Sequence, residues 1–242
     1  MSRWTEVSRN PNSAEARRSR REVLDRARRP PVPNRAEHLA EIARGKRVLD
    51  VGIVDHGEFS RGRSSWLHGH VARAAGYCLG IDVLADEVEK IRAAGYNARV
   101  ADITRAPYDG GIDEQFDVIV CGDVIEHLGS PEGLFRAASH LLSPGGRLVI
   151  TTPNAFFLGV IRRHLFGREN DSVDHVTLLF PSGIAELSER EGLALASYRG
   201  TMLGTESSRR RLMFRLRKLF PLLGLRVACA CPTIIYECVM PE

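Results

Sequence analysis

The sequence predicts an α/β fold in which a mostly parallel sheet is doubly wound, with helices on both faces. From residue 46 onward, apolar runs of strand length alternate with segments of helical pattern, and this alternation is typical of parallel sheets. The runs are apolar throughout, as expected for strands that are covered on both faces. At 242 residues, 43% of them hydrophobic, the chain is long enough for one such domain and short for two.

The first half of the domain is predicted to hold three strands and two helices. Each strand is a short apolar run that ends at or beside an acidic residue, and the three runs lie at 47–52, 76–82 and 97–102. The helices are expected between them, at 64–75 and 86–94. Gly95 directly follows the second helix and is a common signal for a helix end. Right-handed crossovers between such strands then determine most of the topology.

The second half continues the alternation. Pro131 stands in the first turn of a helix, where proline is favoured, and a Ser-Pro-Gly-Gly turn precedes the fifth strand. The expected elements, in chain order, are a strand at 116–122, a helix at 131–142, a turn at 143–146, a strand at 147–152, a helix at 181–191, and strands at 193–198 and 233–239.

Two basic segments stand apart from this pattern. Residues 1–35 are predicted to be a basic N-terminal arm with a short helix between 13 and 28, and residues 36–242 to be the domain. Residues 207–228 are predicted to be a basic, amphipathic insert before the last strand. Clusters of arginine favour an anionic partner, and the insert suits an anionic membrane surface, although an arginine-rich solvated helix face would have the same composition.

The cysteines and the apolar content indicate the compartment. Cys229 and Cys231 form a C-x-C pair with no second pair at zinc spacing, so no metal site is predicted. The start of the chain lacks the apolar segment of a secretory signal, and no apolar run approaches the ~18 residues that cross a bilayer. We therefore expect a cytoplasmic protein, with peripheral contact at the inner face of the membrane through the insert.

Acidic residues at three successive strand ends suggest a binding site. Ligands of open α/β sheets bind outside the carboxyl ends of the strands, where the strand order reverses. Asp50 precedes Gly52, whose missing side chain lets the backbone approach a ligand closely, and Asp50 could orient that turn. Asp82 can accept both hydroxyls of a ribose. Asp102 can accept from an adenine amino group, with Ile103 as an apolar wall.

These strand ends resemble the motifs of class I S-adenosylmethionine-dependent methyltransferases, and the motifs occur in the right order. The resemblance rests on Val48-Leu49-Asp50-Val51-Gly52, Leu79-Gly80-Ile81-Asp82, Ala101-Asp102-Ile103, 116–120 and 142–150. It implies a seven-stranded sheet with an antiparallel last strand and S-adenosylmethionine as cofactor. It also adds Val83, Cys121 and Gly122 to the residues predicted to bind the cofactor.

One position departs from the family pattern. The usual turn is G-x-G-x-G, whereas here Val54 replaces the middle glycine, so the turn is expected to be wider. The same substitution breaks the G-x-G-x-x-G fingerprint and argues against a dinucleotide-dependent dehydrogenase. Residues 66–70 together with 174–176 resemble methyltransferases of cell-surface glycan biosynthesis, a group in which the glycine turn is also degraded.

Two histidines are the predicted catalytic residues. Methyl transfer to a hydroxyl is helped by a general base, and histidine is the usual base near neutral pH. His127 follows the fourth strand, with Asp123 and Glu126 close by in sequence. His175 lies in a polar loop after the fifth strand, where the family builds its acceptor lid. For either residue the alternative is a contact with cofactor or substrate without proton transfer.

The sequence therefore predicts an O-methyltransferase that acts on a sugar or glycan precursor or another small molecule. An RNA methyltransferase and a cofactor-binding module without catalysis are the alternatives. Nucleic acid is the less favoured partner, because no basic stripe interleaved with aromatic residues is present.

Overall fold

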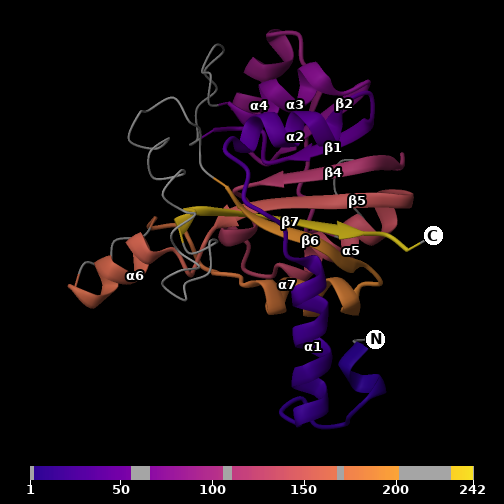
Figure 1. Ribbon diagram of the computed structural model, residues 1–242. Coiled ribbons are helices and arrows are strands. Elements are labelled where there is room, and N and C mark those ends of the chain that lie inside the picture. Colours follow the sequence, from indigo (N-terminus) through magenta and orange to yellow (C-terminus); the bar gives the residue numbers. More distant parts are fainter. Residues whose placement is uncertain (1–2, 56–65, 106–110, 168–171, 202–229, 242) are drawn as a thin grey trace.

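The computed structural model describes residues 3–55, 66–105, 111–167, 172–201 and 230–241. Seven strands of these residues form one sheet in the order β3-β2-β1-β4-β5-β7-β6 (Figure 1). The bounds are β1 Arg47–Val51, β2 Tyr77–Asp82, β3 Ala98–Val100, β4 Phe116–Gly122, β5 Leu142–Pro153, β6 Ala194–Thr201 and β7 Thr233–Val239. This confirms the predicted doubly wound α/β sheet.

The strand directions follow the prediction as well. β1 pairs in parallel with β2 and β4, β2 with β3, and β4 with β5, whereas β7 is antiparallel to both β5 and β6. From β1 the chain first adds strands on one side and then, with β4, on the other. The order therefore reverses between β1 and β4, which is where an open α/β sheet binds its ligands.

Helices cover the sheet on both faces (Figure 1). Alternate residues of a strand point to opposite faces, so Val48 packs with Leu39 of α2 and Leu49 packs on the other side with the cluster of α5 and α7. The helices are α1 Ala14–Ala27, α2 Arg35–Ala43, α3 Leu67–Ala74, α4 Ala85–Ala93, α5 Glu132–Leu141, α6 Leu158–Leu165 and α7 Pro181–Arg190, with short 3-10 helices η1 Arg3–Glu6 and η2 Ile125–His127.

Some bounds differ from the sequence-based expectation. β5 begins at Leu142 rather than at residue 147, because Leu142 pairs with Phe116 before the turn brings Arg147 opposite Val118. β6 extends to Thr201, beyond the expected end at 198, because its pairing with β7 continues to Thr233. Neither α2 nor α6 was expected.

The N-terminal segment lies against the domain. The predicted helix is present as α1, capped by the Ser13 side chain, which accepts from the Ala16 amide. After α1 the chain runs along the outer strand, and Arg28 and Val32 form parallel bridges with Tyr198 and Thr201 of β6. The boundary at residue 35 stays a prediction, but residues 14–33 extend the packed structure rather than leave it.

The predicted insert at 207–228 lies outside the described residues. Within the described ranges, no helix combines the length and the apolar character needed to cross a bilayer.

Candidate active site

Gly52 makes the turn that follows β1. Its φ is +77°, in the left-handed region that favours glycine, and its amide donates to the Ile81 carbonyl at 2.8 Å. A Cβ at this position would lie 2.0 Å from Cγ2 of Val124. The turn thus brings bare backbone to the point where the strand order reverses, as predicted for a close approach to a ligand.

We expect Gly52→Ala to lower the free energy of unfolding by about 2–5 kcal/mol, because left-handed backbone costs alanine roughly 1–2 kcal/mol and overpacking roughly 1–3 kcal/mol. Urea unfolding measures this loss. Introducing Gly52→Ala into a Val124→Ala background should cost less, since the clashing methyl is gone and only the backbone strain remains. Equal losses in the two backgrounds would show that Val124 does not confine this position.

Asp82, at the end of β2, is held by backbone amides. One carboxylate oxygen accepts from the Val54 amide at 3.0 Å and the other from the Leu84 amide at 3.1 Å. Val54 packs its side chain against the cluster of Ile53 and Trp66. The residue that replaces the family's middle glycine therefore supplies a backbone donor to Asp82, and its side chain has a place in the core.

Asp50 is buried and hydrogen-bonded. Its carboxylate lies 2.8 Å from Nδ1 of His68, and both side chains are at most 4% exposed. The His68 ring packs against Gly80, where a Cβ would meet it at 2.8 Å, and stands edge-on to Trp66. His68 therefore fixes the acid beneath the glycine turn.

The remaining predicted cofactor residues differ in exposure. Asp102 accepts from the amide and hydroxyl of Thr104 at 2.9 and 2.7 Å, Ile103 is buried, and Val83 is 61% exposed. Gly122 packs closely on Leu67, since a Cβ there would lie 2.4 Å from its Cδ2. The Cys121 side chain is fully buried in the core, so its predicted contact with the cofactor stays a prediction for its backbone.

On the other side of the switch point, the two predicted catalytic histidines come together. Their ring centroids are 4.9 Å apart with an interplanar angle of 73°. Nδ1 of His127 lies 3.2 Å from a carboxylate oxygen of Asp174, and about a third of the His127 side chain is exposed. Asp174 forms an ion pair with His127, and its charge also interacts with His175. The Ser172 hydroxyl, donating to Asp174, is the main cause that holds the pKa of Asp174 below its usual range.

Glu126 connects the segment after His175 to strand β5 by hydrogen bonds. Its carboxylate accepts from the Thr152 hydroxyl at 2.9 Å, and its backbone carbonyl accepts from the amides of Val176 and Thr177 at 2.9 and 3.1 Å. The side chain is buried, and this burial raises its pKa to about 7, with the nearby Asp123 carboxylate adding to the rise.

This raised pKa makes stability depend on pH. Glu126 binds its proton more tightly in the folded chain, so its contribution is complete below the usual pKa of 4.5 and is lost as the pH rises to about 7. We expect Glu126→Gln, which does not titrate, to gain about 3 kcal/mol on the wild type between pH 4.5 and pH 8. Urea unfolding at both pH values measures the gain, and a pH-independent difference would contradict it.

Arg35 is a site residue that sequence reasoning missed. It begins α2, and its guanidinium pairs with the Asp123 carboxylate and lies 3.3 Å from the Thr151 hydroxyl. Asp123 has a φ of +54°, which is uncommon outside glycine, and the Thr151 hydroxyl also donates to it at 3.2 Å. A residue from the segment before β1 thereby fixes the backbone just after β4.

The chain also offers one set of metal-ligating groups among its described residues. One ligand atom each of Glu126, His127 and His175 lies within 4.8 Å of the others. Two imidazoles and a carboxylate are a donor set that zinc accepts in catalytic sites. The sequence predicted no metal site because these residues carry no recognisable spacing along the chain.

Comparison with known proteins gives a consistent result. Residues 19–198 match the methyltransferase domain family. The chain is similar to ubiquinone biosynthesis O-methyltransferases of Aeromonas salmonicida, at 25% identity over 64% of this chain and 66% of that protein, and of Bordetella avium, at 28% identity over 69% and 71%. A third relative of this name, from Pseudomonas fluorescens, is 30% identical over 48% of this chain. The chain spans between 50% and 71% of the length of these three relatives.

Solved structures share the fold at low sequence identity. Magnesium protoporphyrin IX methyltransferase of Synechocystis, with bound S-adenosylhomocysteine, is 14% identical with a TM-score of 0.53 over 85% of this chain and 83% of its own. An S-adenosylmethionine-dependent methyltransferase of Mesorhizobium loti is 17% identical with a TM-score of 0.52 over 85% and 98%.

Proposed function

We propose a reaction for this chain on the premise that it belongs to the methyltransferase domain family. It is a methyltransferase, and S-adenosylmethionine is its cofactor. The proposed reaction is methylation of a hydroxyl oxygen on a small molecule. The observation that carries it is the pairing of His127 with Asp174, in the segment after β4 whose Val124 lies against Gly52.

The residues after β1, β2 and β3 fit an adenosyl ligand. Gly52 has no room for a side chain, because Val124 fills the space where its Cβ would lie, so only backbone faces this turn. The Asp82 carboxylate is half-buried and accepts from two amides, which leaves lone pairs for a ligand. We assign the ribose to Asp82 and the adenine to Asp102 and Ile103. Val83 and Gly122 lie at the same carboxyl-terminal edge of the sheet. Asp50 acts indirectly, by holding the turn of Gly52 in place. When bound, the cofactor supplies a methyl group already activated on a sulfonium.

The proton of the acceptor is assigned to His127. With its Nδ1–H donating to Asp174, its Nε2 carries a lone pair and can accept a proton. As the acceptor oxygen takes the methyl group that the cofactor would supply, Nε2 of His127 would take the hydroxyl proton. His175 stands edge-on to His127 and orients it or the acceptor.

The side chains next to this pair favour an acceptor with an apolar body. Val176, Leu178 and Phe180 follow His175 and are each more than 40% exposed. We therefore favour a phenolic hydroxyl on an apolar molecule, which is also the chemistry suggested by relatives named for ubiquinone biosynthesis. A sugar or glycan hydroxyl is the second candidate, supported by the resemblance of residues 66–70.

We further propose that α6 contacts an anionic membrane surface. None of its residues is buried, and in Figure 1 it projects from the body of the domain. Leu165 and Phe166 are 78% and 77% exposed, and Arg162 and Arg163 lie beside them. Apolar side chains flanked by arginine suit the interface of an anionic bilayer.

Replacing both Leu165 and Phe166 by aspartate is expected to reduce binding to anionic liposomes about tenfold or more, because apolar area is lost and negative charge is added. Sedimentation with phosphatidylglycerol vesicles measures the loss. Val7→Asp is the matched control, since Val7 is an exposed apolar residue on η1's side of the chain. Equal binding of the two variants would remove α6 from any membrane contact.

The reaction is tested with labelled S-adenosylmethionine and three acceptors: an alkyl dihydroxybenzene, an alkyl glycoside and a short RNA. We expect label on the phenolic oxygen. Label only on the glycoside would make the second candidate correct, and saturable cofactor binding without transfer to any acceptor would contradict both. Turnover should survive EDTA. Loss in EDTA with recovery in Zn²⁺ would instead assign Glu126, His127 and His175 to a metal.

A further inference from the structure

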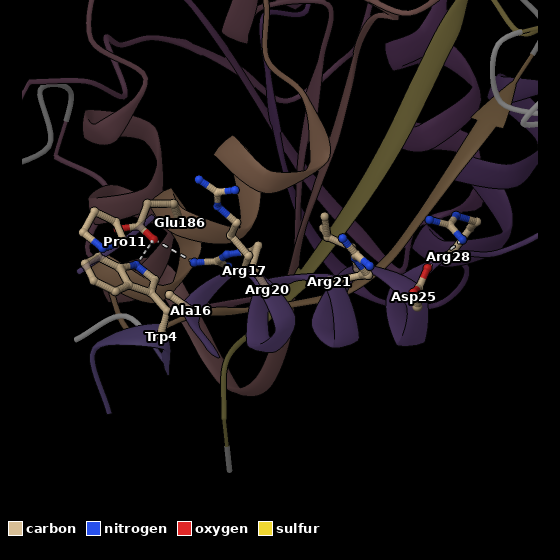
Figure 2. Close-up of a pocket in the computed structure, with 10 residues that line it drawn as sticks. Trp4, Pro11, Ala16, Arg17, Arg20, Arg21, Asp25, Arg28 and Glu186 are labelled. Carbon is tan, nitrogen blue, oxygen red and sulfur yellow. Dashed lines mark hydrogen bonds and ion pairs between the residues drawn. The ribbon is translucent and has the colours of Figure 1, made fainter. Parts of the chain in front are cut away.

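A groove beside the N-terminal helix α1 has no role in this reaction. It lies between η1, α1 and α7 and has a volume of about 570 Å³. Figure 2 shows its wall, with arginines of α1 following one another along the groove between Trp4 and Arg28. This volume is within the range of small-molecule sites, and the hollow shape does not suit the flat surface of a bilayer.

The floor of the groove is apolar, and a hydrogen bond holds its aromatic ring in place. Ala16 is buried, Leu24 is half-buried, and the half-buried Trp4 donates its indole N–H to Glu186 of α7 at 3.0 Å. The indole ring is thus held in place by a hydrogen bond between two parts of the chain 182 residues apart. A fixed aromatic ring beside aliphatic side chains is a surface for the apolar part of a ligand.

The acidic groups at the groove are already paired. Arg20 reaches both oxygens of Glu189 at 3.0 Å and Glu186 at 2.7 Å, and Arg28 pairs with Asp25 at 2.8 Å. These contacts join α1 to α7 and account for the negative charge of the lining. The remaining positive charge therefore belongs to the other two arginines of the lining.

Those two are Arg17 and Arg21. Both are exposed, and no acidic side chain among the described residues forms an ion pair with either of them. They stand four residues apart on one face of α1, where like charges destabilise a helix slightly. Two guanidinium groups in this spacing can bind one anion together, and a bound dianion would remove their repulsion.

We propose that this groove binds a small molecule that carries a phosphate monoester on an apolar body. A phosphate monoester has close to two negative charges and three acceptor oxygens, which match the two guanidinium groups better than a single carboxylate does. Its apolar body lies over Trp4 and Leu24. The proposal does not depend on the acceptor of the methylation reaction.

The test is calorimetric titration with phenyl phosphate of the full chain saturated with S-adenosylhomocysteine, which keeps the probe out of the cofactor site. We expect wild type to bind phenyl phosphate at least about tenfold more tightly than phenol or inorganic phosphate, since both parts contribute. Arg17→Glu with Arg21→Glu should weaken binding about tenfold or more. Arg18→Glu with Arg26→Glu is the matched control, with the same charge change on α1 outside the groove.

Three results would overturn the proposal. The first is that phenyl phosphate does not saturate the wild type below about 10 mM. A dissociation constant of that size corresponds to a binding free energy of under 3 kcal/mol. The second is equal weakening by the control pair, which would indicate a general effect of charge. The third is inorganic phosphate binding as tightly as phenyl phosphate. Arg17→Gln with Arg21→Gln repeats the loss without added negative charge, and helical content by circular dichroism verifies that α1 is intact.

Discussion

Replacing Asp82 by alanine is expected to lower the affinity for S-adenosylmethionine about 100-fold or more. Hydrogen bonds to a charged group contribute about 1.5–3 kcal/mol each, and two ribose hydroxyls would lose such a partner together. The same change frees the Val54 and Leu84 amides, which now donate to Asp82 at 3.0 and 3.1 Å, and so loosens the turn above β1. Isothermal titration with S-adenosylmethionine measures the loss.

Asp86→Ala is the control for that experiment. Asp86 is an exposed carboxylate in the first turn of α4, four residues from Asp82, so its removal changes the charge equally without touching the strand end. We expect its effect to stay within a factor of about three, the scale of a helix-terminus charge. If Asp82→Ala and Asp86→Ala bind the cofactor alike, the ribose is not held at β2.

The strands of the sheet could be predicted from the sequence because each is a continuous apolar run. Strand 233–239 was predicted with the bounds that β7 has, since Pro232 precedes a run of β-branched and aromatic residues. α2 was not predicted, although the Asn34 side chain caps it by accepting from the Ala36 and Glu37 amides. α6 has no buried residue, so no core contact shapes its apolar pattern.

The candidate site also contains residues that could be predicted from the sequence and residues that could not. The acids at the strand ends could be predicted, since the carboxyl ends of neighbouring parallel strands meet at one edge. Arg35 and His68 could not, because each acts by pairing with an acid that lies far away in sequence, Arg35 with Asp123 and His68 with Asp50. Only the folded chain brings these partners together. Asp123 is thus paired with a guanidinium group and Asp50 with an imidazole.

His127→Ala is expected to lower kcat about 100-fold or more while leaving the affinity for S-adenosylmethionine unchanged, because general-base catalysis has this scale. A third of the side chain is exposed, and it contacts His175 and Asp174 at the surface, so its removal should leave the fold intact. Kinetics with the phenolic acceptor measure the loss. His140→Ala, at an exposed histidine of α5, is the control and should retain wild-type turnover.

Substitution of Asp174 tests whether His127 acts in catalysis or only contacts the acceptor. If its carboxylate orients Nδ1–H of His127, then Asp174→Asn should lower kcat about tenfold with little change in KM, and adding it to His127→Ala should cost nothing further, because residues that act as a unit are not additive. Additive losses would therefore mean that the two residues act separately, and near-normal turnover of His127→Ala would transfer the role of base to His175, whose ring is 4.9 Å away.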